Sequence, residues 1–322
     1  MRFLDAAAVA ALGPAAAARA VTDALRGGLD PAADPARTAV GVGQGQFLLM
    51  PSAAAWTPAG AAGTPAGAVG TAAGAAAGVK VATVAPGNPA RGLPRIHAVY
   101  LLFDPETLAP RAVLDGTALT TLRTPAVSVA AVEARLPQRP LRIVLVGAGP
   151  QARGHAAALA SVRPVERAVH LVRDLRTAPP GARPGDVMTL GTAGAEEVLR
   201  SADVVVCATS ARTPVFDSAL LRDDVVVVAV GSHEPDAREL DAALLARATV
   251  VVEDAATALR EAGDVVLAVA EGALAAERLV RLPDVVTGTV TPPTDRPLVF
   301  KSVGMAWEDL VVATAVAAAR PA

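Results

Sequence analysis

Apolar residues recur along this chain in two different patterns. From Leu141 onward, short and almost wholly apolar runs alternate with segments of helical spacing; the runs are "RIVLV", "AVHLV", "DVVVC", "VVVVAV" and "TVVV". Runs without polar alternation are typical of strands covered on both faces, as in a parallel sheet flanked by helices. This part of the chain is predicted to form a doubly wound α/β sheet.

The part before Leu141 predicts fewer strands and a different arrangement. Residues 3–29 predict two alanine-rich helices separated at Gly13-Pro14. "DPARTAVGVGQGQFLLMP" predicts two strands joined by a glycine turn, and "VKVATVAPGNPARGLPRIHAVYLLFD" predicts strands around a Pro-Gly-Asn-Pro turn. "TALTTLRTPAVSVAAVEARL" has helical spacing, and the last segment predicts a short strand, a Ser-Val-Gly turn and a helix.

Length and composition set the organisation. A chain of 322 residues exceeds the usual single core, so we expect two domains. Hydrophobic residues make up 52% and aromatic residues only 2%, so the core must use small aliphatic side chains. The glycine- and alanine-rich segment 53–78 lacks the large side chains that a core needs and is predicted to be a mobile loop.

The charge and the cysteine content limit the kinds of partner and site that this chain is expected to have. With 29 basic and 31 acidic side chains, well mixed, nothing indicates binding to nucleic acid or to a membrane, so we expect small molecules and copies of the chain itself as partners. The single cysteine, Cys207, excludes a disulfide framework and fits the cytoplasm. The amino-terminal residues do not resemble a signal peptide. The four histidines, His97, His155, His170 and His233, show no metal-ligand spacing, so no metal site is expected.

A dinucleotide-binding turn is predicted at "VLVGAGPQA". Gly147, Gly149 and Ala152 follow an apolar strand and open a helix in a GxGxxA spacing. The first glycine permits the tight turn, the second admits a pyrophosphate close to the backbone, and the small third residue lets helix and strand pack. The alternative is a glycine-rich turn without a ligand.

The end of the second strand of this fold distinguishes the two nicotinamide cofactors. An acid there binds the ribose of NAD, whereas an arginine accommodates the 2′-phosphate of NADP. If the strand stops at Val172, Arg173 follows directly and favours NADP(H), with NAD(H) as the other possibility. A shift of two residues would make Asp174 the ribose acid, and Arg173 could instead be a solvated strand-end charge.

Several motifs together resemble the ornithine cyclodeaminase and mu-crystallin family. They are "PARTAV", "FLLMP", "GVKVATVAPGNP", "TALTTLRT", "VGAGPQA", "ATSARTPVF", "VGSHEPDARELD" and "FKSVGMAWEDL", in the order that the family has. The resemblance implies an α+β domain that binds substrate and forms a homodimer, at residues 1–125 and 300–322. It also implies a Rossmann domain at residues 126–299.

The resemblance also assigns site residues. It implies that Arg37, Lys80 and Arg123 bind the substrate carboxylate, with Lys80 also catalytic. Two arginines and a lysine can hold a carboxylate by charge-assisted hydrogen bonds. From its spacing alone, Arg37 is more typical of a surface arginine than of a site residue. The cofactor positions that the resemblance implies are Arg123, Thr124, Gly147, Ala148, Gly149, Pro150, Gln151, Arg173, Thr209 and Ser302.

Two features depart from the family pattern. "RDLRTAPPGARPGDV" stands where a helix should follow the second strand, and the glycine-alanine insert precedes Lys80. In "VGSHEPDAREL", His233 occupies the position at which the cyclodeaminases carry their catalytic aspartate. His233 is therefore a candidate proton donor or hydrogen-bonding group, or it only shapes the nicotinamide pocket. Asp236 and Glu239 have the spacing of a capping box and are predicted to cap the next helix.

Without that aspartate, the resemblance favours ketimine reductase chemistry over cyclodeamination. We expect an NAD(P)H-dependent reductase of cyclic imino acids, such as pyrroline-2-carboxylate or piperideine-2-carboxylate. The alternatives are an amino-acid or opine-type dehydrogenase, a divergent ornithine or lysine cyclodeaminase, and a non-enzymatic NADP-binding protein.

Overall fold

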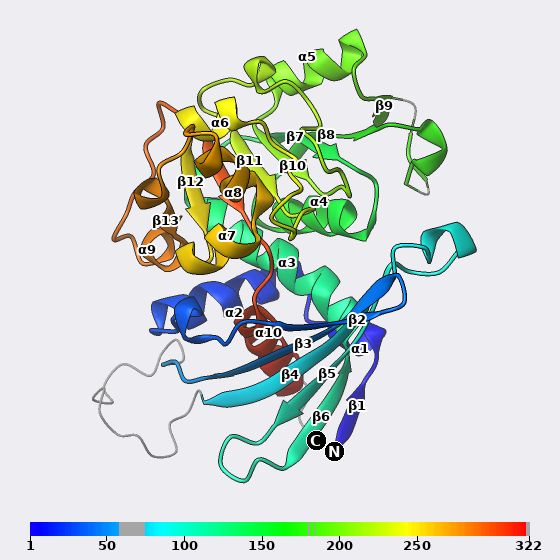
Figure 1. Ribbon diagram of the computed structural model, residues 1–322, viewed down its shortest axis with the longest axis vertical. Helices are drawn as coiled ribbons and strands as arrows, with labels where there is room; N and C mark the ends of the chain where they lie inside the picture. Colours follow the sequence, from blue (N-terminus) through cyan, green and yellow to red (C-terminus); the bar gives the residue numbers. More distant parts are fainter. Residues whose placement is uncertain (58–74, 180, 184, 320–322) are drawn as a thin grey trace. The chain divides into compact units, whose positions relative to one another are not determined.

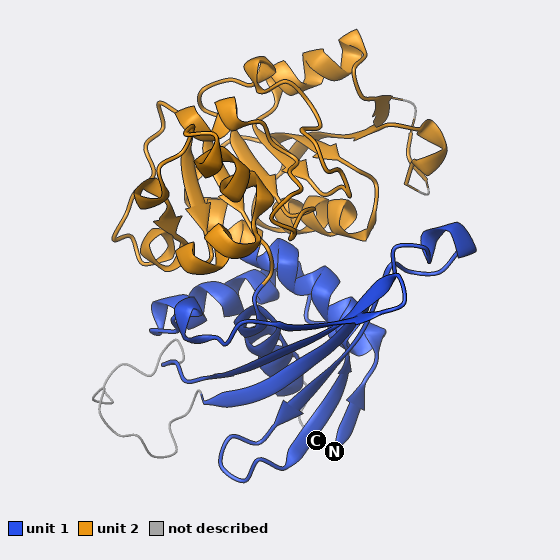
Figure 2. Ribbon diagram, in the orientation of Figure 1, with its two compact units in different colours: residues 1–127, 305–322 blue, residues 128–304 orange. Residues whose placement is uncertain are grey.

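The computed structural model describes residues 1–57, 75–179, 181–183 and 185–319. Most of the predicted mobile loop, residues 58–74, lies outside this range. The chain forms two compact units, which Figure 2 colours separately. Unit 1 comprises residues 1–127 and 305–322, and unit 2 comprises residues 128–304.

Unit 1 contains a six-stranded sheet in the order β1-β6-β5-β4-β3-β2. The strands are β1 (Arg2–Leu4), β2 (Thr38–Val42), β3 (Gly45–Ala54), β4 (Ala76–Val84), β5 (Ile96–Phe103) and β6 (Pro110–Asp115). Neighbouring strands are antiparallel except for the parallel pair β1 and β6. Every second side chain of β4 is buried, so one face of the sheet is covered and the other is less so.

Unit 1 also contains helices, and the last of them covers that buried face. They are α1 (Ala6–Ala10), α2 (Pro14–Arg26), α10 (Ala306–Ala318) and most of α3 (Gly116–Val132), with the short helices η1 (Pro31–Ala33) and η2 (Pro89–Arg91). Helix α10 packs on β3, β4 and β5 and on α2 (Figure 1). Its side chains are almost all buried, because the sheet lies on one side and α2 lies alongside. The predicted amino-terminal helices, the hairpin of β2 and β3, and the final helix are confirmed.

Unit 2 contains an eight-stranded sheet in the order β13-β12-β14-β11-β10-β7-β8-β9, and all its neighbouring pairs are parallel. The strands are β7 (Leu141–Val146), β8 (Val165–Val172), β9 (Val187–Thr189), β10 (Val204–Cys207), β11 (Val226–Ala229), β12 (Thr249–Val252), β13 (Val280–Arg281) and β14 (Leu298–Lys301). The order reverses between β7 and β10, and in open parallel sheets ligands bind at the carboxyl ends of the strands next to such a reversal. The predicted fold class, a Rossmann sheet plus an α+β part, is confirmed.

The helices of unit 2 connect these strands. They are α4 (Pro150–Val162), α5 (Ala193–Ser201), α6 (Ala242–Arg247), α7 (Ala255–Glu261), α8 (Gly263–Ala270) and α9 (Leu282–Val286), with η3 (Glu133–Arg135), η4 (Leu175–Thr177), η5 (Ser218–Leu220) and η6 (Ala276–Arg278). All residues of β10 and β11 are buried, as their valine runs predict. In the described part of the segment after β8, only η4 interrupts the loop before β9, which confirms the predicted absence of a helix there.

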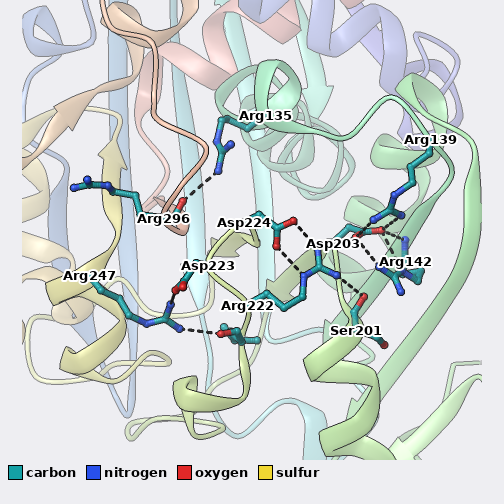
Figure 3. Close-up of polar contacts among 11 residues, drawn as sticks. Arg135, Arg139, Arg142, Ser201, Asp203, Arg222, Asp223, Asp224, Arg247 and Arg296 are labelled. Atoms are coloured by element: carbon teal, nitrogen blue, oxygen red, sulfur yellow. Dashed lines mark hydrogen bonds and ion pairs between the residues drawn. The ribbon is translucent and has the colours of Figure 1, made fainter.

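Asp203 organises the opposite end of the unit 2 sheet, where β7 and β10 begin (Figure 3). Its carboxylate accepts hydrogen bonds from both terminal nitrogens of Arg139, at 2.8 and 2.7 Å, and from the Arg142 backbone at 2.9 Å. Arg222 lies 3.3 Å away. Burial alone would raise the pKa of Asp203, but the hydrogen bonds from Arg139 and Arg142 hold this pKa well below its usual range. This cluster joins the beginnings of β7 and β10, at the edge of the sheet opposite to their carboxyl ends.

Candidate functional site

Lys80 lies on β4 in unit 1, on the sheet face that α10 covers. It is 3% exposed, and its Nζ donates a hydrogen bond to Oδ2 of Asp309 on α10 at 2.6 Å. Tyr100 on β5 lies directly beside Lys80 in the sheet register. A lysine so deeply buried needs a charged partner, and Asp309 supplies it.

Arg123 joins the same cluster from helix α3. Its NH1 binds Oε2 of Glu308, and its Nε lies 3.3 Å from Oδ1 of Asp309. Glu308 and Asp309 are both completely buried, so α10 brings two negative charges to the two cations Lys80 and Arg123. The structure thus brings two of the three predicted carboxylate-binding residues together through Asp309.

Sequence reasoning assigned no role to Glu308 or Asp309. The available signal was the occurrence of two adjacent acids at the start of the otherwise apolar final helix, "AWEDLVVATAVAAA". Glu308 also accepts a hydrogen bond from the Met305 backbone N–H at 2.9 Å, and so caps the helix that carries it.

Asp34 is a further acid of this cluster that the sequence did not reveal. It accepts hydrogen bonds from the Ser52 hydroxyl at 2.6 Å and from the Trp307 backbone N–H at 2.5 Å. Burial, aided by the charge of Asp309, raises the pKa of Asp34 to about 6. Arg37 follows three residues later, half-buried, between η1 and β2.

Burial also shifts the pKa values of Lys80 and Tyr100. For Lys80, burial and then the positive charge of Arg123 lower the pKa to about 8, although Asp309 opposes the shift. For Tyr100, burial and the charges of Asp309 and Asp34 raise the pKa well above 10. No described residue hydrogen-bonds the buried Tyr100 hydroxyl. Unit 1 thus holds a buried lysine whose pKa is lowered to about 8 within a compact ionic cluster.

In unit 2, the glycine turn after β7 has the geometry expected of a phosphate-binding loop. Gly147 has a φ of 113°, and a Cβ there would lie 2.7 Å from the carbonyl oxygen of Ala208. Gly149 is the N-cap of α4 and offers no side-chain cap, and a Cβ there would meet nothing within 4 Å. Helix α4 thus begins at a glycine without a side-chain cap, and such a helix N-terminus fits a pyrophosphate. His170 supports the turn, with its Nδ1 2.8 Å from the Gly147 carbonyl oxygen.

The residues after β8 are those from which the sequence predicts the choice between NAD(H) and NADP(H). Strand β8 ends at Val172, and Arg173 is exposed directly after it. Asp174 binds Arg176, whose Nε and NH2 lie 2.9 and 2.6 Å from its Oδ2, and also accepts from the Arg176 backbone N–H. Its carboxylate is therefore already engaged within the short helix η4.

Two other predicted cofactor residues, Thr209 and Ser302, follow β10 and β14. The hydroxyl of Thr209 donates to Glu239 at 2.7 Å, and the hydroxyl of Ser302 donates to Glu253 at 2.6 Å. Glu253 also accepts from the Gly304 backbone N–H at 3.0 Å and so organises the Ser-Val-Gly turn. Both hydroxyl hydrogens are therefore directed at buried glutamates, which sequence reasoning did not identify as partners.

On α3, Thr124 donates its hydroxyl hydrogen to the Thr120 carbonyl oxygen at 3.0 Å. Of the remaining predicted cofactor residues, Ala148 accepts a hydrogen bond from Arg153 at 2.8 Å through its carbonyl oxygen. Pro150 and Gln151 form the first turn of α4. Each predicted position thus lies on the element that the sequence indicated.

The loop that carries His233 corrects one prediction. Helix α6 begins at Ala242, and its N-cap is Asp241, whose side chain accepts from the Leu244 N–H at 2.8 Å. Asp236 and Glu239 therefore do not form the predicted capping box. Asp236 binds Arg212 at the surface at 2.5 Å, while Glu239 is completely buried and binds backbone N–H groups. His233 is half-buried in this loop.

Clusters that could hold a metal ion and helices that could span a membrane are two further features to consider among the described residues. Among them there is no group of three or more histidine, cysteine or acidic side chains that could hold a metal ion. None of the described helices is long and apolar enough to cross a membrane.

Comparison with known proteins gives one family and similar folds. The model of the "Ornithine cyclodeaminase/mu-crystallin family" matches residues 65–319. A relative from Azospirillum brasilense, a Delta(1)-pyrroline-2-carboxylate/Delta(1)-piperideine-2-carboxylate reductase, is 38% identical over 236 residues, covering 72% of this chain and 73% of its own length.

Two solved structures resemble nearly the whole chain. The Delta(1)-pyrroline-2-carboxylate reductase of Thermococcus litoralis, in complex with NADH and L-proline, has a TM-score of 0.82 and 28% identity, covering 98% of this chain and 96% of its own. An archaeal alanine dehydrogenase dimer with bound NAD has a TM-score of 0.79 and 26% identity, covering 98% and 94%.

Proposed function

The chain belongs to the ornithine cyclodeaminase/mu-crystallin family, and from this premise we propose that it is an NAD(P)H-dependent reductase of cyclic imino acids. The proposed substrates are of the pyrroline-2-carboxylate and piperideine-2-carboxylate type, with proline and pipecolate as products. The names of the similar reductases from Azospirillum brasilense and Thermococcus litoralis support this choice.

The observation that carries the proposal is the buried pair of cations Lys80 and Arg123 in unit 1. An imino acid presents a carboxylate next to the carbon to be reduced, and these cations can bind that carboxylate by charge-assisted hydrogen bonds. A guanidinium has five N–H donors, so Arg123 can contact a substrate in addition to Glu308 and Asp309. Arg37 is the third proposed carboxylate ligand.

The acids of the cluster set the charge of this site. Glu308 and Asp309 balance Lys80 and Arg123, so the site can remain buried before a substrate enters. A bound NAD(P)H would supply a hydride to the carbon of the protonated C=N bond, giving the C–H bond of the amino acid and NAD(P)+, while the nitrogen keeps its proton. Lys80 and Arg123 fix the substrate so that its imine carbon is presented in one orientation.

His233 is the proposed polar group of unit 2 near the reacting atoms. A half-buried histidine can donate a proton or a hydrogen bond near neutral pH. In the alternative, the ring only shapes the pocket, and measurement of kcat distinguishes the two roles. His233→Ala should lower kcat about 10- to 100-fold if the ring supplies a proton. His233→Asn would restore part of the rate if only a hydrogen bond is needed.

For the cofactor, we propose that the turn of residues 147–151 binds the pyrophosphate and that Arg173 selects NADPH over NADH. Two observations support Arg173: it is exposed at the end of β8, and the competing carboxylate of Asp174 is engaged by Arg176. NADH is the alternative cofactor. The preference for NADPH would be contradicted if kcat/KM were equal for NADH and NADPH and if Arg173→Ala left both values unchanged. Thr124 and Ser302 are proposed to contact the cofactor through their backbone or through hydroxyl oxygen lone pairs. Thr209 is proposed to do so through its backbone, because its hydroxyl donates to Glu239 and accepts from the Ala211 N–H.

We further propose a homodimer formed through the less covered face of the unit 1 sheet. That face carries half-buried apolar side chains, as the alternation of burial along β3, β4 and β5 requires; they include Phe47, Leu49, Val81, Leu101 and Phe103. The dimeric state named for the similar alanine dehydrogenase supports this assembly. A cytoplasmic location is proposed from the single cysteine, Cys207, which is buried and unbonded.

The test is an assay of NADPH and NADH oxidation with a panel of cyclic imines and with 2-oxo acids plus amines. We expect turnover with pyrroline-2-carboxylate or piperideine-2-carboxylate and a loss of at least about 100-fold in kcat/KM for Lys80→Ala. No turnover on any imine would contradict the proposal. Ammonia release from ornithine or lysine without added reductant would favour a cyclodeaminase instead, and turnover of 2-oxo acids with amines would favour an amino-acid dehydrogenase.

A further inference from the structure

Glu239 joins the loops that follow two neighbouring strands of unit 2. Strands β10 and β11 are parallel neighbours, so Thr209 and Gly231, which follow them, lie at the same edge of the sheet. Oε1 of Glu239 accepts hydrogen bonds from the Thr209 backbone N–H and hydroxyl, both at 2.7 Å. Oε2 accepts one from the Gly231 N–H, also at 2.7 Å. A single carboxylate therefore holds both loops.

Asp264 and Lys301 fix the segment that carries Glu239. Oδ1 of Asp264 accepts from the backbone N–H groups of Glu239 and Leu240, at 2.7 and 2.8 Å. Lys301 lies 2.9 Å from Oδ2 of Asp264 and donates to the Ser232 carbonyl oxygen at 2.6 Å. Glu239, Asp264 and Lys301 are exposed by 1% or less, so this arrangement is shielded from solvent.

The packing around Glu239 leaves little room for another arrangement. A Cβ at Gly231 would lie 2.2 Å from the Thr209 carbonyl oxygen and 2.5 Å from Oε1 of Glu239, so only glycine fits. At the surface, Arg212 joins the same two loops a second time, because it binds Glu234 and Asp236 at 2.5 Å each. The loop of residues 231–240 is therefore joined to the loop after β10 by a buried contact, through Glu239, and by a surface contact, through Arg212.

The same contacts adjoin the glycine turn. Ala208, which precedes Thr209, lies against Gly147 so closely that a Cβ on Gly147 would be 2.7 Å from the Ala208 carbonyl oxygen. A displacement of Thr209 would therefore be transmitted to the turn. The three hydrogen bonds to Glu239 also need a carboxylate. In a glutamine, the amide NH2 would take the place of one oxygen and would face a backbone N–H, which is also a donor.

We propose that Glu239 is a positioning residue for dinucleotide binding. It holds Thr209 and the loop that carries His233 in the arrangement that receives the nicotinamide half of the cofactor, and Asp264 and Lys301 hold Glu239 in place. This rests on the proposed function only in requiring that the chain bind a nicotinamide dinucleotide. The role explains why an acid with the spacing of a helix cap is buried and directed away from helix α6.

The first test compares Glu239→Gln with Glu196→Gln, which makes the same change on α5 in an exposed pair with Arg200. Dissociation constants for NADPH and NADH are measured by fluorescence titration of the whole chain. We expect Glu239→Gln to bind about 10- to 100-fold more weakly and Glu196→Gln to bind within about twofold of the wild type. A folded Glu239→Gln protein that binds both dinucleotides within about twofold of the wild type would overturn the proposal.

A second pair of variants covers the case in which Glu239→Gln does not fold. Thr209→Val removes one hydrogen bond to Glu239 and keeps the shape of the side chain, and we expect about 3- to 10-fold weaker binding. Thr209→Ser keeps the hydroxyl and should restore most of that loss. If Thr209→Ser binds as weakly as Thr209→Val, the contact with Glu239 is not what matters.

The role of Glu239 and the proposed imine reductase activity are tested by different measurements. If the wild-type protein binds dinucleotides but reduces no imine, the proposed function fails while the role of Glu239 is still decided by the titrations. If the wild-type protein binds neither NADPH nor NADH, the role of Glu239 is overturned as well.

Discussion

The Nζ of Lys80 on β4 lies 2.6 Å from Oδ2 of Asp309 on α10, and both side chains are buried. The pair joins the centre of the unit 1 sheet to the last helix of the chain. Because burial and Arg123 lower the pKa of Lys80 to about 8, the charge on this lysine depends on pH in the range where enzymes are usually assayed.

The first prediction concerns the pH dependence of substrate binding. In the proposed role, only the protonated form of Lys80 binds the substrate carboxylate, so binding should be complete well below the pKa of about 8 and be lost as the pH rises through it. KM for the imino acid should rise about tenfold per pH unit above that point. The arginine of Lys80→Arg keeps its positive charge over the whole range from pH 6 to 9.5. In this variant, the rise of KM at alkaline pH should therefore be absent or small. A wild-type KM that stays constant across this range would contradict the role of Lys80.

The second prediction separates Asp309 from Lys80. The negative charge of Asp309 raises the pKa of Lys80, so Asp309→Asn should lower that pKa and move the midpoint of the KM profile by about one unit toward acid. Glu106→Gln, at an exposed position in the loop between β5 and β6, is the control and should leave the midpoint unchanged. An unmoved midpoint in Asp309→Asn would mean that the profile reports another group.

A third prediction concerns the glycine turn. A methyl group on Gly149 meets no protein atom within 4 Å, so Gly149→Ala should leave the melting temperature nearly unchanged. The methyl group would nevertheless stand where the pyrophosphate approaches, and binding of NADPH should weaken at least about tenfold. Gly147→Ala differs because its φ of 113° and the contact with Ala208 strain any side chain, so its melting temperature should fall clearly. Calorimetry and fluorescence titration on both variants distinguish the two effects, and normal NADPH binding by Gly149→Ala would exclude this turn as the phosphate site.

The fourth prediction concerns His155, which joins α3 to α4 within unit 2. Its Nδ1 lies 2.8 Å from the Gln151 carbonyl oxygen and so carries the proton, and its Nε2 accepts from the Ser128 hydroxyl at 2.9 Å. Burial lowers the pKa of His155 to about 4, so the unfolded chain binds a proton between about pH 6.5 and 4 that the folded chain does not. Stability is therefore lost as the pH falls through this window.

Between pH 7 and pH 5 this loss should be about 2 kcal/mol in the free energy of unfolding. Urea titrations of the wild type and of His155→Gln measure it. The wild type should lose about 2 kcal/mol more than the variant over this interval. Equal losses in the two proteins would mean that His155 does not titrate as described.

The sequence predicted the sheet of unit 2 well because buried parallel strands leave a local signature. Runs such as Val225 to Val230 have no polar alternation, and the glycine turn has a fixed spacing. The sequence failed at Glu239, because D-x-x-E has the same local pattern whether it caps a helix or binds backbone groups of distant loops. Only the tertiary fold brings Thr209 and Gly231 to Glu239.

For a similar reason, the sequence revealed only part of the ionic cluster of unit 1. Lys80 stands out as a lone charge on an apolar strand, whereas its partner Asp309 follows it at a separation of 229 residues. No periodicity within either segment links the two. The burial that lowers the pKa of Lys80 and raises that of Asp34 likewise arises only when α10 covers the sheet.

The position of α10 also sets the order in which the protein can be completed. The strands of unit 1 are synthesised first, but the helix that covers their apolar face is made last, after the whole of unit 2. During translation, the face that carries Met50, Lys80 and Tyr100 must therefore remain without its covering helix. The surface proposed to bind the substrate is thus formed only when the segment of residues 306–318 has been added to the sheet of unit 1.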